Sequence, residues 1–409
     1  MYAKLFHGAD RSTEQGTIFS EIPVEEVESR PAAQVGEVAV GDLALGKLKQ
    51  PAEEEAEEAS EEMEPEEETE EEIPWDPPAD DDFHRYLTTS EEDAITFAFA
   101  GDILFDPGYA IMTHIRQNGG TMSGVMGGGL LEELRSADVA VINNEFSYSD
   151  RGAPREGKTF TFRAAPESAA LLNEMGIDLA TFANNHSYDY GPEALLDSLA
   201  AVRAQGIATA GAGADIGEAS SPVIYENAGG VKVAVFAATQ IERLNNPDTR
   251  GATEDSPGVF RCLDDSRLLA RIREAREEGY IVIVCIHWGT ENEEPIDWWQ
   301  QKQAPEIAAA GTHLIIGAHP HILQGIGYCG DTPVVYSIGN FLFNSRSLDS
   351  CIIRARITTE GVSELTFIPA LQSGCEVREA TGAEVERILA HIRSLSPGVT
   401  IGNDGMISH

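Results

Sequence analysis

The sequence predicts an α/β fold built around a largely parallel sheet. Short apolar runs of strand length recur between Ala94 and Leu371, and each stops at a polar or glycine-containing loop. Segments with helical patterns separate these runs. Strands that alternate with helices pair in parallel and are covered by the helices, so the α/β class follows from the order of the elements.

The predicted strands are apolar runs that end at polar residues. The first, Ile95–Ala100, alternates large and small apolar side chains and stops at Gly101-Asp102. The others are Asp138–Ile142, Leu179–Ala183, Val231–Ala238, Tyr280–Ile286, Leu314–Ile316 and Val334–Ser337. After Cys351, apolar residues at alternate positions, first at Ile353, Ala355 and Ile357 and then at Leu365 and Phe367, predict a closing hairpin.

Helices are predicted between the strands. Pro166–Met175 begins with proline and is followed by Gly176, which is the usual asymmetry of helix ends. Pro192–Ala204 also begins with proline and is closed by Gly206. Further predicted helices are Ser266–Glu278, Trp298–Ala310 and Glu384–Leu395.

The chain divides into three predicted regions: residues 1–93, 94–371 and 372–409. Residues 1–93 are predicted to be a mostly disordered acidic region, because 14 of the 20 residues from Glu53 to Glu72 are glutamate. That run is read as a solvated spacer or, alternatively, as a cation-binding or partner-docking tail. Residues 94–371 form the α/β domain, and residues 372–409 are predicted to be a helical tail.

The net charge of -41 bears on possible partners. A strongly acidic protein repels polyphosphate, so we expect neither nucleic acid nor an anionic membrane surface as a partner. The five cysteines form no C-x-x-C pair, which favours free thiols in a reducing compartment. The sequence shows no signal-peptide core and no run of 18 apolar residues, so we expect a chain without a transmembrane segment.

Polar side chains of the kinds that bind metals follow most of the predicted strands. Ligands of α/β proteins bind beyond the carboxyl ends of strands, so these side chains are expected to converge. Taken singly, each has an ordinary interpretation: a turn former, a surface acid or a core histidine. The set is Asp102, Glu145, Asn185, His186, His287, His319 and His321.

His319-Pro320-His321 is the most specific single feature of this set. In an extended segment, residues two apart face the same way, and the intervening proline favours an extended conformation at His319. Two neutral imidazoles that share a direction suit a transition metal. We therefore predict that this pair binds metal.

In order along the chain, the motifs resemble those of the CapA family of poly-γ-glutamate capsule biosynthesis proteins, relatives of the calcineurin-like metallophosphoesterases. The resemblance covers Ala94 to Phe343. It rests on Gly101-Asp102-Ile103-Leu104, Asn144-Glu145, Phe162-Arg163-Ala164, Asn184-Asn185-His186, Asp189, His287-Trp288-Gly289, Gly317-Ala318-His319-Pro320-His321 and Ser337-Ile338-Gly339-Asn340-Phe341. It implies an α/β/β/α sandwich with two central mixed sheets and a site at one edge of them.

The resemblance also implies roles for individual residues. Asp102, Glu145 (as the bridging acid), Asn185, His287, His319 and His321 correspond to metal ligands, and His186 to the histidine that contacts the leaving group. Phosphoesterases usually have a histidine ligand two residues after the first aspartate, and here that position is Leu104. The expected cofactor is a divalent transition metal (manganese, zinc or iron), one ion firmly bound and a second position left open.

Two functions from different classes follow. The first is a metal-dependent hydrolase in capsule biosynthesis, with His186 as the general acid and with Lys158, Arg163 and Asn184 as candidate contacts to a phosphoester or an anionic polymer. The alternative is a non-catalytic assembly or export factor for an anionic capsule polymer, working with other capsule-synthesis components. The lack of a signal or anchor favours a cytoplasmic location, whereas the family resemblance favours an extracytoplasmic one.

Overall fold

The structure is a computed structural model that describes residue 75, residues 77–241 and residues 249–409. The described residues belong to a single compact unit. The acidic glutamate run, for which disorder was predicted, lies outside the described residues. Within them, no helix has the length and apolar character needed to cross a bilayer.

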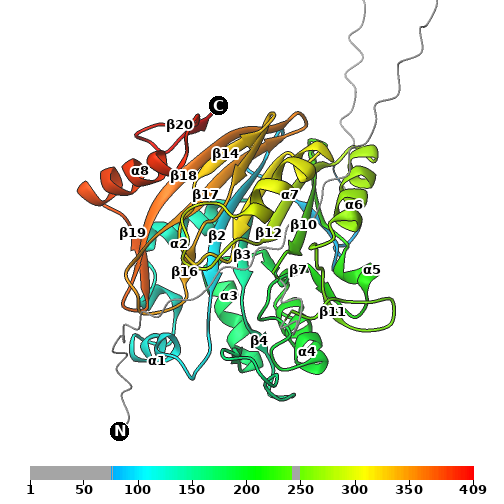
Figure 1. The fold of residues 1–409 in the computed structure, drawn as a ribbon, viewed down its shortest axis with the longest axis vertical. Helices are drawn as coiled ribbons and strands as arrows, with labels where there is room; N and C mark the ends of the chain where they lie inside the picture. Colours follow the sequence, from blue (N-terminus) through cyan, green and yellow to red (C-terminus); the bar gives the residue numbers. More distant parts are fainter. Residues whose placement is uncertain (1–74, 76, 242–248) are drawn as a thin grey trace, which may run out of the picture. The chain divides into compact units, whose positions relative to one another are not determined.

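Two central sheets organise the unit (Figure 1). The seven-stranded sheet, called the first sheet, has the spatial order β1 (His84–Leu87), β9 (Val223–Asn227), β10 (Lys232–Thr239), β12 (Ile281–His287), β13 (Leu314–Ala318), β15 (Thr332–Val335) and β14 (Ile326–Cys329). Its β10, β12, β13 and β15 are parallel to one another, while β9 and β14 are antiparallel to their neighbours β10 and β15.

The eight-stranded sheet, called the second sheet, is also mixed. Its order is β19 (Glu376–Glu379), β18 (Gly361–Ser373), β17 (Leu348–Thr358), β2 (Ile95–Ile103), β3 (Val139–Asn144), β6 (Leu179–Thr181) and β7 (Ala208–Ala210), and β16 (Asn340–Leu342) pairs with the end of β2. Strands β2, β3, β6 and β7 are parallel, and β17–β18 is the predicted hairpin. Short strand pairs complete the unit: β4 (Ser147–Tyr148) with β5 (Arg163–Ala164), β8 (Ala212–Gly213) with β11 (Gly258–Val259), and β20 (Thr400–Ile401) with β21 (Ile407–Ser408).

Helices cover the outer faces of both sheets. The second sheet packs against α1 (Ala110–Gln117), α2 (Gly128–Ser136), α3 (Ala170–Met175) and α4 (Pro192–Arg203). The first sheet packs against α5 (Ile216–Ala219), α6 (Ser266–Glu277) and α7 (Trp298–Ala309). Two short 3₁₀ turns lie at Met122–Gly124 and Pro166–Ala169, and α8 (Ala383–Leu395) packs on the core between the sheets. The four layers confirm the predicted α/β/β/α arrangement.

Side-chain alternation explains why the strands are buried on both faces. In β2, Phe97 and Phe99 point into the core between the sheets, whereas Ala98 and Ala100 face the helices. In β12, Ile283 and Cys285 enter the same central core, while Val282, Val284 and Ile286 face α6 and α7. Near-continuous apolar runs are expected wherever a parallel strand is covered on both sides.

The described unit extends beyond both predicted domain boundaries. Strand β1 starts ten residues before Ala94 and pairs in parallel with β9. Its short sequence has little apolar alternation, so its pairing depends on tertiary context that the sequence does not display. At the other end, β18 runs through Ser373, and β19 follows it in the second sheet, so residues 372–409 contain strands as well as the predicted helix.

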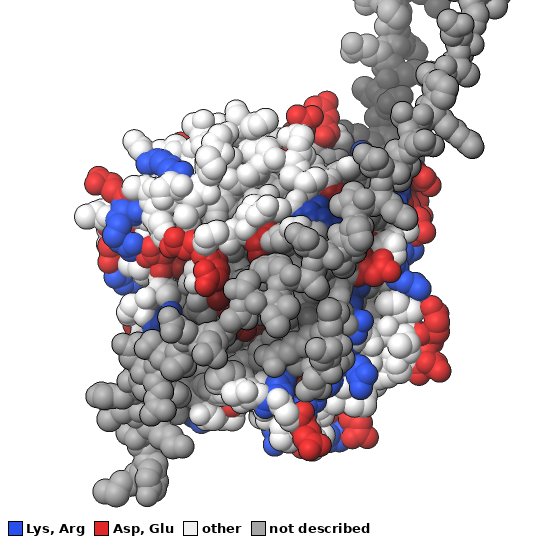
Figure 2. Space-filling model, viewed as in Figure 1, with Lys and Arg blue, Asp and Glu red and all other residues white. Residues whose placement is uncertain are grey.

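Charged side chains of both signs are interspersed on the face shown in Figure 2. Several exposed pairs are in contact, among them Arg387 with Asp349 at 2.6 Å and Arg378 with Glu384 at 2.8 Å. Exposed pairs of this kind contribute between about 0 and 1 kcal/mol each to stability. Surface charge is therefore a minor stabilising factor beside the apolar core.

Gly101 allows β16 to approach the end of β2. A Cβ added at Gly101 would lie 1.9 Å from the carbonyl oxygen of Gly339, the same oxygen that accepts a hydrogen bond from Asp102 N at 3.0 Å. We expect Gly101→Ala to lower the free energy of unfolding by about 3 kcal/mol, because overpacking forces the backbone to shift. Gly128→Ala is the matched control, since an added Cβ there meets no atom within 4 Å. Equal denaturation midpoints for the two variants would contradict this account of the β2–β16 contact.

Candidate metal centre

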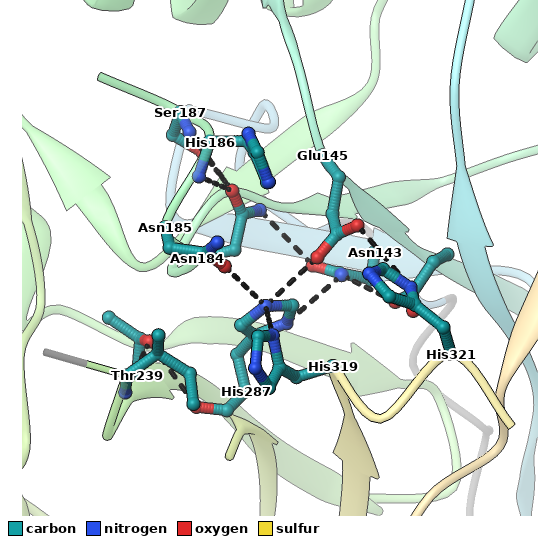
Figure 3. Close-up of polar contacts among 12 residues, drawn as sticks. Asn143, Glu145, Asn184, Asn185, His186, Ser187, Thr239, His287, His319 and His321 are labelled. Carbon is teal, nitrogen blue, oxygen red and sulfur yellow. Dashed lines mark hydrogen bonds and ion pairs between the residues drawn. The ribbon is translucent and has the colours of Figure 1, made fainter. Parts of the chain in front are cut away.

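The predicted ligands lie at the carboxyl ends of parallel strands from both sheets. Asp102 is the penultimate residue of β2 and Glu145 follows β3, while His287 ends β12 and His319 follows β13. Figure 3 shows the side chains of Glu145, His287 and His319 pointing toward one another. Because the two sheets place their carboxyl ends together, residues more than about 200 positions apart reach one point.

Four residues, each with one donor atom, form what we call the first ligand group: Glu145, Asn185, His287 and His319. His287 Nε2 lies 2.9 Å from Glu145 Oε1, 2.9 Å from Asn185 Oδ1 and 3.0 Å from His319 Nδ1 (Figure 3). A ring nitrogen carries at most one proton, so it cannot donate good hydrogen bonds to three atoms at once. A metal ion among the four would instead take a lone pair from each.

The second ligand group consists of Asp102, Glu145 and His321. Ligand atoms of these three residues all lie within 4.8 Å of one another. His321 Nδ1 is 3.0 Å from Asp102 Oδ2 and 3.9 Å from Glu145 Oε2. Glu145 therefore belongs to both groups, with one carboxylate oxygen toward His287 and the other toward His321.

The position of His321 departs from the sequence prediction. His319 and His321 were expected to lie on an extended segment and to share a direction. Both instead have positive φ, 98° and 60°, and their ring centroids are 5.9 Å apart. The bend sends one imidazole to each ligand group. Positive φ is uncommon in residues other than glycine, and such strain is often found at functional sites.

Burial and neighbouring charges shift the ionisation of this cluster. Burial raises the pKa of Glu145, but the adjacent His321 and His287 outweigh it and lower the pKa below its ordinary value. Burial and the Glu145 charge together raise the pKa of Asp102. Burial and His287 hold the pKa of His319 well below its ordinary value, which keeps this imidazole neutral and able to donate a lone pair. Burial opposes protonation of His321, yet Glu145 and Asp102 raise its pKa to about 9.

The Glu145 carboxylate provides the test of whether a metal fits. Its side chain is fully buried, and neither oxygen has a hydrogen bond to the part of the chain that the structure describes. A buried carboxylate needs a nearby positive charge or a metal ion to compensate its own charge. The ion-pair partners that the structure gives these oxygens are ring nitrogens of His287 and His321. The donor set of carboxylate, amide oxygen and imidazole fits a divalent metal ion.

His186 lies beside the ligand groups and is oriented by Asp189. His186 Nδ1 is 2.8 Å from Asp189 Oδ2, and its ring lies against Phe162 with centroids 4.3 Å apart. Asp189 is fully buried and is itself held by Phe162 N at 2.8 Å and by Lys158 Nζ at 2.6 Å. A carboxylate that fixes Nδ1 leaves Nε2 as the reactive ring nitrogen.

The three predicted substrate contacts lie in different surroundings. Lys158 lines the cleft but is ion-paired with Asp189, and its side chain is only 6% exposed. The guanidinium of Arg163 stacks over Tyr190 at 4.5 Å. The Asn184 side chain is buried, donates to Asn144 O and accepts from the backbone N–H groups of His186 and Ser187 (Figure 3), so it shapes the loop that carries His186.

The prediction missed Asn143 as a site residue, and it named Asp189 as part of the family resemblance without giving it a role. Asn143 Nδ2 donates to Asp102 Oδ1 at 2.7 Å and lies 3.2 Å from His287 Nδ1, so this amide contacts both ligand groups (Figure 3). A polar residue ending a buried strand was the available signal for Asn143. For Asp189, the signal was a carboxylate three residues after a histidine.

A cleft of about 400 Å³ opens beside the first ligand group. Residues that line it include Asn185, His186, His319, Lys158, Phe160 and Trp299. Glu291 and Asp297 place acidic groups at the same opening. A ligand in this cleft would contact His186 and His319 together.

These features define a two-sheet α/β protein with a buried His/Glu/Asp cluster that could hold a metal. The family model described as "Bacterial capsule synthesis protein PGA_cap" matches residues 96–345, which is 250 of the 409 residues. The chain belongs to this family, and the predicted CapA membership is confirmed.

Curated relatives carry related descriptions. The "PGA biosynthesis protein CapA" of Bacillus subtilis is 27% identical over 307 residues, covering 74% of this chain and 76% of that protein. The "Capsule biosynthesis protein CapA" of Bacillus anthracis is 28% identical and covers 52% of each chain. A "Probable polyglutamine synthesis accessory protein" of Mycobacterium tuberculosis is 26% identical over 51% of this chain and 56% of its own length.

A solved structure, that of the Thermus thermophilus protein TT1561, aligns with a TM-score of 0.37 and 10% identity over 65% of this chain and 99% of that chain. The fold described above rests on the sheets and helices of this chain itself.

Proposed function

We propose that this chain is a metal-dependent hydrolase acting in bacterial capsule synthesis. The observation that carries the proposal is the position of Glu145. Its buried carboxylate belongs to both ligand groups, and the first of these groups reaches the cleft lined by His186 through Asn185 and His319. A buried carboxylate among imidazoles at the ends of strands, with a strongly lowered pKa, is typical of a functional site.

The donor types support a divalent transition metal. Glu145 and Asn185 offer oxygens, while His287 and His319 offer ring nitrogens, and this mixed set suits Mn²⁺, Fe²⁺ or Zn²⁺. His287 Nε2 is 2.9, 2.9 and 3.0 Å from its three neighbours in the first ligand group, so these donors lie close enough to share one ion.

Different residues of the chain would serve different steps of hydrolysis. A divalent metal held by the two ligand groups would polarise a substrate oxygen and lower the pKa of a water molecule. His186, protonated at Nε2, would donate that proton to the leaving group, while Asp189 stabilises the positively charged ring. Lys158 offsets the charge of Asp189 and fixes the loop through Asn185 O.

The substrate class we propose is a phosphoester or a γ-glutamyl amide of an anionic polymer. Both present an oxygen for the metal and a leaving group that needs a proton. The descriptions of the capsule-synthesis relatives favour the γ-glutamyl amide of the polymer over the phosphoester as the substrate.

A second candidate is a non-catalytic factor for assembly or export of the capsule polymer. The observation that favours it is the word "accessory" in the description of the M. tuberculosis relative. In that case metal binding would support structure or polymer contact, without turnover.

The two candidates differ in one assay. The full chain, loaded with Mn²⁺, would be incubated with a phosphoester panel and with γ-linked glutamyl peptides, beside a sample stripped with a chelator. The hydrolase proposal expects turnover that disappears on stripping and returns with Mn²⁺. A chain that binds metal tightly but hydrolyses neither panel would overturn the hydrolase proposal and leave the accessory role.

A further inference from the structure

The motif Ser337-Ile338-Gly339-Asn340-Phe341 has no role in the ligand groups described so far. Its fourth residue, Asn340, opens β16 and is paired with Asp102 across the β16–β2 contact. Two hydrogen bonds fix its backbone region: Asp102 N donates to Gly339 O at 3.0 Å, and Ser350 Oγ donates to Asn340 O at 2.7 Å. The position of this side chain relative to Asp102 is therefore set by the sheet.

The Asn340 side chain points into the second ligand group. It is fully buried, and its Oδ1 lies 2.9 Å from His321 Nδ1, which is itself 3.0 Å from Asp102 Oδ2. One ring nitrogen thus faces two oxygens at nearly equal distances. Both oxygens are at hydrogen-bonding distance from this ring nitrogen, so all three atoms lie close enough to share one ion.

The hydrogen bonding of the Asn340 amide is also incomplete within the described part of the chain. Its Nδ2 is buried there without a hydrogen-bond partner. A metal ion would bind this amide through Oδ1, which carries the lone pairs, and not through Nδ2. An amide oxygen is a suitable donor for Mn²⁺ or Fe²⁺, as Asn185 is in the first ligand group.

Leu104 supplies no donor to the second ligand group. Its side chain is 1% exposed and belongs to the apolar core beneath the helices. Its side chain offers no lone pair. Without Asn340, the second ligand group therefore has three donor residues, Asp102, Glu145 and His321. For the same reason we expect Leu104→His to bury an imidazole among apolar side chains and to destabilise the fold.

We propose that Asn340, from β16, is a metal ligand of the second group. The inference rests on the metal centre of the proposed function and extends it to four donors in each group: Glu145, Asn185, His287 and His319 in the first, and Asp102, Glu145, His321 and Asn340 in the second. The second ion is then held by a complete set.

Metal stoichiometry of the full chain tests the proposal directly. By equilibrium dialysis with Mn²⁺, the unaltered chain should bind two ions. Asn340→Ala should weaken the second ion by at least about 100-fold, more than the loss of an outer-shell partner costs, and leave the first unchanged. Asn340→Asp keeps an oxygen donor and should retain two ions.

Asn227→Ala is the matched control for loss of a buried asparagine. Asn227 is fully buried far from the ligand groups and hydrogen-bonds Ala94 O at 3.1 Å. This variant should unfold more easily yet bind two ions. If the unaltered chain binds no metal, the proposed function fails. If Asn340→Ala binds two ions as tightly as the unaltered chain, only the role of Asn340 fails.

A spectroscopic variant separates a ligand from a residue that merely orients His321. Asn340→Cys loaded with Co²⁺ should show a thiolate-to-metal charge-transfer band that the Co²⁺-loaded unaltered chain lacks, because a thiolate at this position would bind the ion. A folded, two-ion Asn340→Cys protein without that band would overturn the assignment.

Discussion

Glu145→Ala is expected to remove both metal ions and all metal-dependent hydrolysis. Glu145 is the residue shared by the two ligand groups, with Oε1 2.9 Å from His287 Nε2 and Oε2 3.9 Å from His321 Nδ1. Loss of a shared ligand weakens both positions, each by at least about 100-fold by comparison with outer-shell losses. Metal content after dialysis, measured by mass spectrometry, checks the result.

Glu364→Ala is the matched control for the Glu145 variant. It makes the same change in net charge at an exposed position on β18. It should keep two ions and full activity. Thermal unfolding of both variants would show whether Glu145→Ala remains folded, and a folded Glu145→Ala protein that keeps both ions would contradict the shared-ligand account.

His186→Ala is expected to lower kcat by about 10²- to 10⁴-fold while leaving the metal content at two ions. The magnitude is that of losing a general acid, and His186 belongs to neither ligand group. Steady-state kinetics on whichever substrate the panel identifies, together with metal analysis of the same sample, checks both halves of the prediction.

Asp189→Asn provides a graded companion to His186→Ala. The His186 ring would keep its position, but the charge that stabilises its protonated form would be lost. The fall in kcat should therefore be smaller than for His186→Ala. An unchanged kcat in His186→Ala would remove this residue from the mechanism, even if the metal centre stands.

Several buried strands could be predicted because local sequence determines them. A strand such as β2, buried on both faces, must be apolar throughout, and the polar residue at its end marks the site edge. The same logic placed Asp102, His287 and His319 near one another. Family resemblance added the pairing of the two sheets, which no local pattern contains.

The division into two ligand groups could not be predicted, because it depends on backbone conformation. The positive φ angles of His319 and His321 turn their imidazoles apart, and spacing alone favoured the opposite. The role of Asn340 could not be predicted for a related reason. Its approach to Asp102 is created by the β16–β2 pairing between segments far apart in the sequence, and Gly101 permits that approach.

The most direct test of the metal centre is anomalous diffraction from crystals of the full chain grown with Mn²⁺. The account predicts two anomalous peaks, one on each side of the Glu145 carboxylate, the first touching His287 and His319 and the second touching Asp102 and His321. Crystals that diffract well but show no peak within bonding distance of Glu145 would contradict it.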